Sequence, residues 1–423
     1  MRATTFFKFL FLFVLIFLSS SVDSRELSIK QLEERKKADL ERIKDREKRG
    51  KKGFSKEISL ETKIIFLTKE RKIPPVLSNL DPILDDEGYY GVDIAIEDNL
   101  TTGRFLGHNY LVEFHKVLLE ENLIKEYKKL IKNGEKYFIA DLSAEELIKL
   151  ANLPESEGSL IFNVSSKDDS LRNENCSDNL FHIPPSYSML ADSLTQYLVK
   201  KKWKKWFLVV GDKKNDKKFA DALVNSAEKF NIKIKENKVW DFAADLRRTA
   251  QKEVPIFTKG PNYDVLVVAD EEGSFGEYLP YRTWDPRPVV GTQGLTPTSW
   301  HRTHEQWGAT QMQNRFRRKS GRWMTTVDYA SWTAVRSIGE AVTRVMSNDI
   351  PKLKSYLLGE KFGLGAYKGV KVSFRSWNGQ LRQPVLLAAP RSMISVSPQE
   401  GYLHPKSELD TLGKDKPEST CNF

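Results

Sequence analysis

Short apolar runs that alternate with helical patterns are the feature of this sequence that most constrains its fold. The first run is Ile64–Leu67, and strand-like runs follow at 110–114, 137–141 and 160–164, with helical spacing between them at 86–99 and 123–131. Strands of four to six residues separated by helices are typical of βαβ units, whose strands are parallel. This part of the chain is therefore predicted to form an α/β lobe around a parallel sheet.

The same alternation restarts after the prolines of His182-Ile183-Pro184-Pro185. Strand patterns at 206–211, 232–240, 265–270 and 288–291 alternate with helical patterns at 216–230 and 246–253. Proline interrupts strands and marks boundaries between elements. We therefore predict a second doubly wound α/β lobe that begins near these prolines.

The last third of the chain predicts a long helix at 332–346 and then a hairpin. Asn378-Gly379 lies between the apolar runs Val370–Phe374 and Gln383–Leu387. Asn-Gly is a strong hairpin signal because both turn positions need a positive φ. Such a hairpin would carry the chain back from one lobe to the other. The predicted organisation is a signal peptide at 1–24, a charged leader at 25–57, lobe 1 at 58–183 plus 311–372, lobe 2 at 184–310 plus 373–405, and a tail at 406–423.

The N-terminus has the pattern of a secretory signal. Arg2 and Lys8 precede an uninterrupted run of ten apolar residues, Phe9–Leu18, and a small-residue stretch ends at Ser24. A run of this length is too short for a membrane span, which needs about 20 residues. We expect cleavage after Ser24 and a periplasmic location, and an uncleaved anchor is the alternative.

The net charge of +10 is unevenly distributed. Residues 25–57 hold 13 basic and 8 acidic side chains, and residues 58–423 carry only +4. A nearly balanced folded part argues against a broad nucleic-acid-binding face. The leader is predicted to be a solvated helix or flexible segment, and the alternative is an electrostatic tether to an anionic membrane.

The sequence contains two cysteines, Cys176 and Cys421. In an oxidising compartment they can form one disulfide that ties the tail to the body, or remain two free thiols. Two cysteines cannot build a zinc cage. His301 and His304 lie in a loop rich in Pro, Thr and Trp, and we interpret them as ordinary loop histidines, not metal ligands.

No catalytic motif survives inspection of the sequence. A phosphate-binding GxxxxGK[ST] loop, a GxGxxG turn after a strand and a GxSxG elbow are all missing. We therefore expect a binding protein that is not an enzyme and that has no catalytic cofactor and no metal.

The export signal, the two α/β lobes and the hairpin crossover resemble the type I periplasmic binding proteins that serve ABC importers, the branched-chain amino-acid receptor class. Longer segments resemble one subgroup, the substrate-binding proteins associated with PQQ-dependent alcohol dehydrogenase systems. These segments are DEGYYGVDIAIEDNLTTGRFLG (86–107), DLRRTAQKEVPIFTKGPNYDVLVVADEEGSFGEYLPYRTW (245–284), RPVVGTQGLTPTSWHRTHEQWGATQMQNRF (287–316) and SPQEGYLHPKSELDTLG (397–413).

The resemblance implies a bilobed receptor that closes on a small solute and delivers it to a membrane permease. The ligand would lie at the carboxyl ends of the parallel strands. The positions that match the receptors' ligand contacts are Ser143, Ser165 and Ser166 in lobe 1, and Lys217, Phe219, Glu271, Glu272 and Gln293 in lobe 2. Gln293 departs from the amino-acid receptors, which place an acid there to pair with the ligand ammonium. Glu271 or Glu272 could replace that acid.

Arginine and tryptophan near the expected cleft suggest a different ligand. Arg282 with Trp284, and Arg322 with Trp323, could pair with carboxylates and stack on flat rings, and Trp300 could add a further ring. This combination suits pyrroloquinoline quinone (PQQ) or a related small organic anion. The alternatives are a receptor for amino acids or alcohol-derived metabolites, and a non-transport accessory or sensory protein of a PQQ dehydrogenase system.

Overall fold

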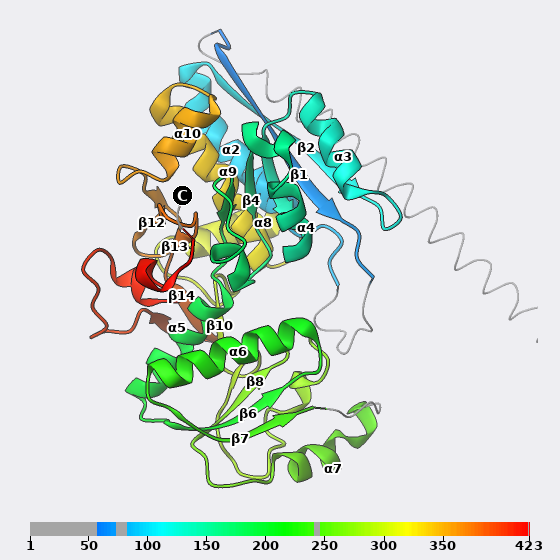
Figure 1. Cartoon of the computed structure of the whole chain (residues 1–423), viewed down its shortest axis with the longest axis vertical. Coiled ribbons are helices and arrows are strands. Elements are labelled where there is room, and N and C mark those ends of the chain that lie inside the picture. The colour runs from blue at the N-terminus through cyan, green and yellow to red at the C-terminus, as the bar shows by residue number, and fades with distance from the viewer. Residues whose placement is uncertain (1–56, 73–82, 241–245, 422) are drawn as a thin grey trace, which may run out of the picture.

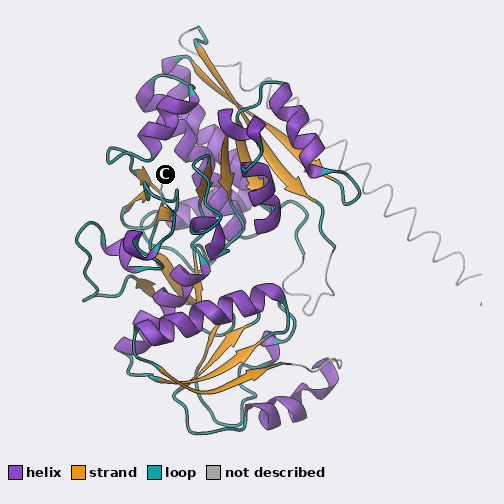
Figure 2. Ribbon diagram, in the orientation of Figure 1, coloured by secondary structure: helices purple, strands orange, loops and turns teal. Residues whose placement is uncertain are grey.

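The computed structural model describes residues 57–72, 83–240, 246–421 and 423 of the 423-residue chain. The predicted signal peptide, and the predicted leader apart from Glu57, lie outside the described residues. Two α/β lobes lie one above the other, and helices cover both faces of each sheet (Figures 1 and 2). In the described part of the chain, no helix has the length and apolar character that a bilayer crossing needs.

Lobe 1 is built on a five-stranded parallel sheet with the order β2-β1-β3-β4-β5. Along β1, Ile64 and Phe66 point to the core that contains α2 and α9, and Ile65 points to the opposite core with α3 and α4. This alternation explains the continuous apolar run, because both faces of the sheet are buried. The bounds are β1 Leu60–Lys69, β2 His108–Val117, β3 Tyr137–Asp141, β4 Leu160–Asn163, β5 Leu180–His182, α2 Tyr89–Leu106, α3 Leu123–Lys132, α4 Ala144–Ala151 and α9 Thr326–Val345.

Lobe 2 repeats this plan with a four-stranded parallel sheet of order β7-β6-β8-β9. One face packs against α5 and α6, and the other face packs against α7. The bounds are β6 Lys205–Val210, β7 Lys233–Val239, β8 Val265–Ala269, β9 Val289–Gly291, α5 Tyr187–Lys200, α6 Lys214–Lys229 and α7 Leu246–Thr258. An antiparallel sheet of β10 (Thr296–Thr298), β14 (Val385–Ala389) and β15 (Ser392–Ser397) completes the lobe. The predicted α/β fold class with two parallel-sheet lobes is confirmed.

The chain crosses between the lobes three times: from β5 to α5, after β10, and from β13 (Leu381–Arg382) to β14. The lobe boundaries differ from the predicted ones. Trp300 already packs in the core of lobe 1, so the chain returns before residue 311. Phe374 also belongs to lobe 1, so the last crossing comes after residue 382 instead of 373. Lobe 1 also contains α8 (Ala309–Ser320), α10 (Ile350–Leu357), β11 (Leu364–Gly365) and β12 (Lys371–Phe374).

The predicted Asn-Gly hairpin is present, with a different second strand. Gly379 has a φ of +65°, and the Arg375 N–H donates to the Gln380 carbonyl at 2.8 Å. The partner of β12 is the short β13, which pairs antiparallel with it. The run expected to complete the hairpin forms β14 of lobe 2, because its apolar side chains pack in the core of that lobe.

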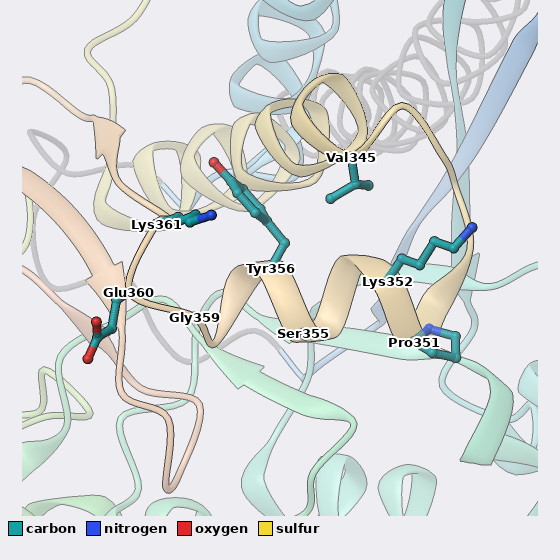
Figure 3. A pocket seen from close by; sticks show the side chains of 8 residues that line it. All are labelled: Val345, Pro351, Lys352, Ser355, Tyr356, Gly359, Glu360 and Lys361. Atoms are coloured by element: carbon teal, nitrogen blue, oxygen red, sulfur yellow. The ribbon is translucent and has the colours of Figure 1, made fainter.

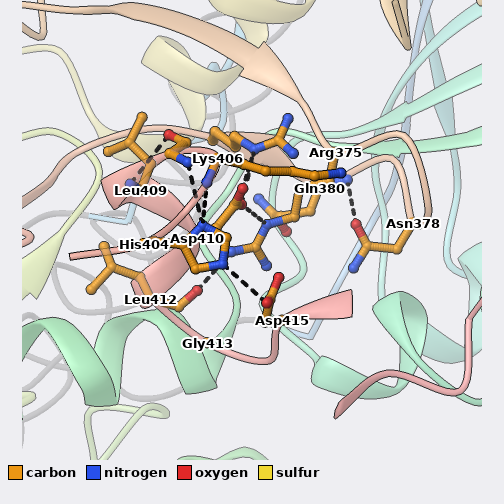
Figure 4. Close-up of polar contacts among 12 residues, drawn as sticks. Arg375, Asn378, Gln380, His404, Lys406, Leu409, Asp410, Leu412, Gly413 and Asp415 are labelled. Atoms are coloured by element: carbon orange, nitrogen blue, oxygen red, sulfur yellow. Dashed lines mark hydrogen bonds and ion pairs between the residues drawn. The ribbon is translucent and has the colours of Figure 1, made fainter. Parts of the chain in front are cut away.

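The C-terminal tail contacts both lobes. Figure 4 shows Asp410 of the tail beside Arg375 of the hairpin. The buried carboxylate of Asp410 pairs with Arg375 at 2.8 Å and with Arg382 at 2.8 Å, and both arginines belong to lobe 1. Two residues later, Leu412 fills the core of lobe 2. Of the two alternatives that the sequence leaves open for the cysteines, the structure has the disulfide, with 2.08 Å between the sulfur atoms of Cys176 and Cys421.

We predict that Asp410→Asn lowers the free energy of unfolding by about 3 kcal/mol, because it leaves a buried guanidinium without its counter-charge. Urea unfolding followed by circular dichroism measures the change. The control Glu408→Gln, at an exposed position in the same turn, should stay within about 0.5 kcal/mol of the unmodified chain. Equal unfolding midpoints for the two variants would contradict a structural role for the Asp410 pairs.

Candidate functional site

The loops that follow the parallel strands of the two lobes contact one another across a shared region, here called the interlobe site. Lobe 1 contributes the loops after β3 and β4, and lobe 2 contributes the first turn of α6, after β6, and the loop after β8. In Figure 1 these loops lie between α4 of the upper lobe and α6 of the lower lobe. The carboxyl ends of parallel strands are where open α/β sheets bind ligands.

Among the described residues, three ion pairs cross the interlobe site. Lys167 Nζ lies 2.7 Å from Glu271 Oε2. The other two run from α6 to lobe 1, joining Lys218 to Asp168 and Lys214 to Glu145. Lys218–Asp168 is the more buried of these two, with 30% and 9% of the side chains exposed.

The lysines of α6 lower the pKa values of their two acidic partners on lobe 1. Burial alone would raise the pKa of Asp168, but the Lys218 ammonium and the Ser170 N–H outweigh burial and lower that pKa below its ordinary value. The hydrogen bond from Lys214 lowers the pKa of Glu145. Both carboxylates are therefore charged at neutral pH, and each forms an ion pair with a lysine of the other lobe.

The serines predicted to bind ligand hold the lobe 1 loops in shape. Ser143 caps α4: its N–H and its hydroxyl both donate to Glu146 Oε2, at 3.0 and 2.8 Å. The backbone N–H groups of Ser165 and Ser166 donate to Asn163 Oδ1 at 3.2 and 2.8 Å. The Glu146 and Asn163 side chains therefore occupy both donors of Ser143 and the backbone N–H groups of Ser165 and Ser166.

Carboxylates order the opposite side of the interlobe site. The Asp270 side chain accepts the N–H groups of Ser274, Phe275 and Gly276 at 2.6 to 2.9 Å and folds the turn after β8. Asp216 accepts the N–H groups of Lys213 in α6's capping turn and of Glu272 in that loop, at 3.2 and 3.1 Å. These two carboxylates position the segment that carries Glu271.

The other positions proposed for lobe 2 are dispersed. Glu272 is exposed and accepts from Asn215 at 2.6 Å. Lys217 is exposed, whereas Phe219 is buried in the core of lobe 2. Gln293 follows β9 and packs so closely on Gly276 that a Cβ there would lie 2.6 Å from Gln293 Cγ.

The arginine and tryptophan cluster expected for a planar ligand is not assembled. The Trp284 N–H donates to Thr258 Oγ1 at 2.9 Å, which places Trp284 beside the end of α7 and away from the interlobe site. Arg282 is exposed, and its guanidinium donates to the Tyr278 carbonyl at 3.4 Å. Trp300 is buried and stacks on Tyr329, with 4.6 Å between ring centroids.

Arg322 and Trp323 lie together in the turn before α9, but both already have partners. Arg322 pairs with Asp86 at 2.9 Å and with Asp328 at 2.6 Å. Trp323 lies under the guanidinium of Arg317, 4.2 Å from the ring centroid. These side chains therefore join α2, α8 and α9 within lobe 1.

Arg172 is the buried residue that sequence inspection missed. Its guanidinium donates to the carbonyls of Ser166 and Pro184, both at 3.0 Å, and to Gln380 Oε1 at 2.7 Å. It also donates to the Asp168 carbonyl at 2.8 Å, and burial lowers its pKa to about 10. One side chain thus connects the loop after β4 to the first interlobe crossing and to the hairpin that precedes the third. A single arginine in a polar stretch of sequence does not indicate that its side chain is buried between distant segments.

Lys368 makes a second connection between crossings. Its buried ammonium donates to the Pro384 carbonyl at 3.1 Å and to the Ser299 carbonyl, which belong to the third and second crossings. Burial lowers the pKa of Lys368 to about 7. Together with Arg172, it fixes how the three connecting segments lie against one another.

A hollow at the far end of lobe 1 is a poorer candidate for a ligand site (Figure 3). It lies beside α10 and is lined by Val345, Tyr356 and Lys361 among others. Lys354 of α10 pairs with Asp178, which precedes the amino end of β5, so this hollow faces away from the interlobe site. Among the described residues, no group of three or more His, Cys, Asp or Glu could hold a metal ion.

Comparison with known proteins supports the assignment of the fold. The family model described as "Periplasmic binding protein" matches residues 121–252. A branched-chain amino acid ABC transporter periplasmic ligand-binding protein from Burkholderia xenovorans has 15% identity and a TM-score of 0.64, over 79% of this chain and 95% of that chain. No curated protein sequence matches the chain.

Two further solved structures contain ligands. A solute-binding protein of an ABC transporter from R. palustris, in complex with benzoate, has 10% identity and a TM-score of 0.62, over 86% of this chain and all (100%) of that chain. A branched-chain amino acid transporter substrate-binding protein from Streptococcus pneumoniae, in complex with isoleucine, has 13% identity and a TM-score of 0.56, over 79% and 98% of the two chains. The chain has the type I periplasmic binding protein fold.

We predict that Arg172→Ala lowers the free energy of unfolding by about 3 kcal/mol, because it leaves buried carbonyls without a donor. Urea unfolding measures the change, with Arg391→Ala at an exposed position of lobe 2 as the control. If the two variants lose equal stability, Arg172 does not connect the loop to the crossings as described.

We predict that Glu271→Lys separates the lobes and that adding Lys167→Glu to it restores the closed arrangement, because the double variant reverses the pair without removing it. Small-angle X-ray scattering at low salt should show a larger radius of gyration for the single variant alone. Asp221→Lys, the same charge change at an exposed position of α6, is the matched control. A single variant as compact as its control would rule out the pair as a contribution to closure.

Proposed function

We propose that this chain is an extracytoplasmic solute-binding protein of an ABC importer, which closes two lobes on a small ligand and presents it to a membrane permease. The observation that carries the proposal is the arrangement itself: two parallel-sheet lobes, joined by three crossings, with their strand ends facing one another. The similarity to periplasmic binding proteins supports it. Opening and closing about such crossings is hinge motion.

For the ligand, we propose a small organic anion, and PQQ of a PQQ-linked alcohol oxidation system is the first candidate to test. The resemblance of the four long segments supports this choice. The lysines at the interlobe site also support it, because Lys167, Lys214 and Lys218 are cations at the strand ends. Benzoate and isoleucine, the ligands of the two complexes described above, both carry a carboxylate. Arg282, Trp284 and Trp300 have other partners in the structure and are not proposed as ligand contacts.

The proposed mechanism is an exchange of partners. A ligand carboxylate that enters the open site competes with Asp168 and Glu271 for their lysines, and the displaced acids are left to bind a donor on the ligand or water. Binding is favourable only if the ligand forms new contacts with both lobes, because these contacts must offset the free energy lost when the ion pairs break. A ligand with both a carboxylate and a hydrogen-bond donor meets this requirement.

A second function is favoured by the same ion pairs. They join the lobes through the side chains of the protein itself, so a closed form could be presented to a partner without transport. This would suit an accessory or sensory protein of a PQQ dehydrogenase system. A receptor for amino acids or for alcohol-derived metabolites is the remaining alternative.

A thermal-shift series tests the proposed function. PQQ, benzoate, leucine and short acids are each added to the folded chain, and a ligand that binds the native state raises the melting temperature by mass action. We predict that Lys218→Gln weakens binding of the stabilising anion by about 10-fold, because it removes one charged contact. Lys361→Gln, at the hollow beside α10, should leave the affinity unchanged.

The outcomes separate the alternatives. Stabilisation by leucine and not by PQQ or benzoate would replace the organic anion with an amino acid. If none of the ligands raises the melting temperature, the transport proposal fails and the accessory function gains support.

A further inference from the structure

Lobe 2 carries a cluster of six exposed lysines, here called the lysine patch. They lie after α5, at the start of β6 and on the edge strand β7 (Figure 1), and they are Lys201, Lys202, Lys204, Lys205, Lys233 and Lys235. The half-buried Trp203 lies among them. The turn between α5 and β6 contains no acidic residue.

Within the described residues, no carboxylate lies in ion-pair contact with any of these six side chains. Neighbouring Lys200 has a long contact of 3.9 Å to Glu400, a side chain that is 94% exposed. Asp264 is close, but its carboxylate accepts the backbone N–H groups of Lys204 and Lys205, both at 2.9 Å. Glu228 at the end of α6 and Glu236 on β7 are also close to the patch in sequence, and among the described residues neither forms an ion pair with it.

The lysine patch is a poor arrangement for stability alone. Lys205 and Lys233 are register partners on neighbouring strands, where like charges repel. Lys202 adopts a φ of +62°, a conformation that glycine reaches at lower cost. Residues 58–423 carry only +4, so without these six lysines that region would be net negative. A concentrated positive field on a balanced protein points to a negatively charged partner.

The position of the lysine patch leaves the interlobe site free. β6 begins at Lys205 in the patch and ends at Val210, next to the turn that leads to α6 and Lys214. A strand of this length spans about 20 Å, so the patch and the site lie at opposite ends of the sheet. A partner bound to the patch would neither cover the site nor block movement of the lobes.

We propose that the lysine patch docks lobe 2 on an anionic phospholipid surface. Clusters of four to eight basic residues are attracted to anionic membranes. Every cation of the patch is a lysine, a flexible point charge, and the planar guanidinium forks that recognise individual phosphate groups in proteins are not among them. This composition suits the diffuse charge of a lipid surface. The half-buried indole of Trp203 adds the type of side chain that favours a membrane–water boundary.

Vesicle co-sedimentation of the full chain tests the proposal. The vesicles contain phosphatidylcholine, with or without one quarter phosphatidylglycerol, at 50 and 300 mM NaCl. We expect binding only to the anionic vesicles at low salt. Since each lysine near an anionic surface contributes about 5-fold, K202Q/K204Q/K205Q should bind about 100-fold more weakly.

The matched control is K125Q/K132Q/K149Q, which removes the same charge from exposed positions of α3 and α4 in lobe 1. It should bind like the unmodified chain, and because all three proteins keep the basic leader, the leader cannot account for a difference between them. Circular dichroism confirms that each variant is folded.

Three results would overturn the proposal: failure of the unmodified chain to bind anionic vesicles, equal binding by the two variants, or binding to a polyaspartate matrix without binding to vesicles. The last result would assign the lysine patch to an acidic protein partner. None of these results bears on the ligand of the interlobe site.

Discussion

The arrangement of the two lobes depends on the buried guanidinium of Arg172. Its donors reach the loop after β4, the first crossing at Pro184 and the hairpin side chain of Gln380, all within 3.0 Å. Since Gln380 also donates to the His182 and Pro184 carbonyls, the first crossing, the hairpin and one site loop form a single hydrogen-bonded unit. A movement at this crossing must therefore also displace the loop after β4, which carries Lys167 and Asp168.

The charges at the interlobe site serve two purposes at once. Lys218 and Asp168 form an ion pair between the lobes, and they are also the groups that we propose a polar ligand engages. Affinity in such a site is a difference between two sets of contacts, because each bond to a ligand replaces a bond within the protein. Selectivity then follows from which ligands can satisfy both members of a broken pair.

The sequence predicts elements that local patterns determine, but it does not predict which distant segments contact one another. The alternation of strands and helices and the hairpin at Gly379 were predictable because each signal lies within a few residues. The second strand of the hairpin was assigned to the wrong segment, since Val385 is apolar in either arrangement and only the core of lobe 2 decides between them.

The candidate site was less predictable than the fold for the same reason. The resemblance indicated loops that form part of the interlobe site, but not the pairs Lys167–Glu271 and Lys218–Asp168, which join residues 104 and 50 positions apart. Trp284 follows a strand–helix unit, and its chain position could not show that it turns back toward the end of α7.

The C-terminal tail has a consequence for the order of assembly. Leu412 completes the core of lobe 2, and Cys421 is joined to Cys176 of lobe 1 across 245 positions. In a chain that enters its compartment N-terminus first, the strands of both sheets therefore emerge long before Leu412 and Cys421, which complete the structure. During that interval the unfinished cores remain exposed to aggregation and to proteases, and a chaperone that shields them would be needed only until residue 421 emerges.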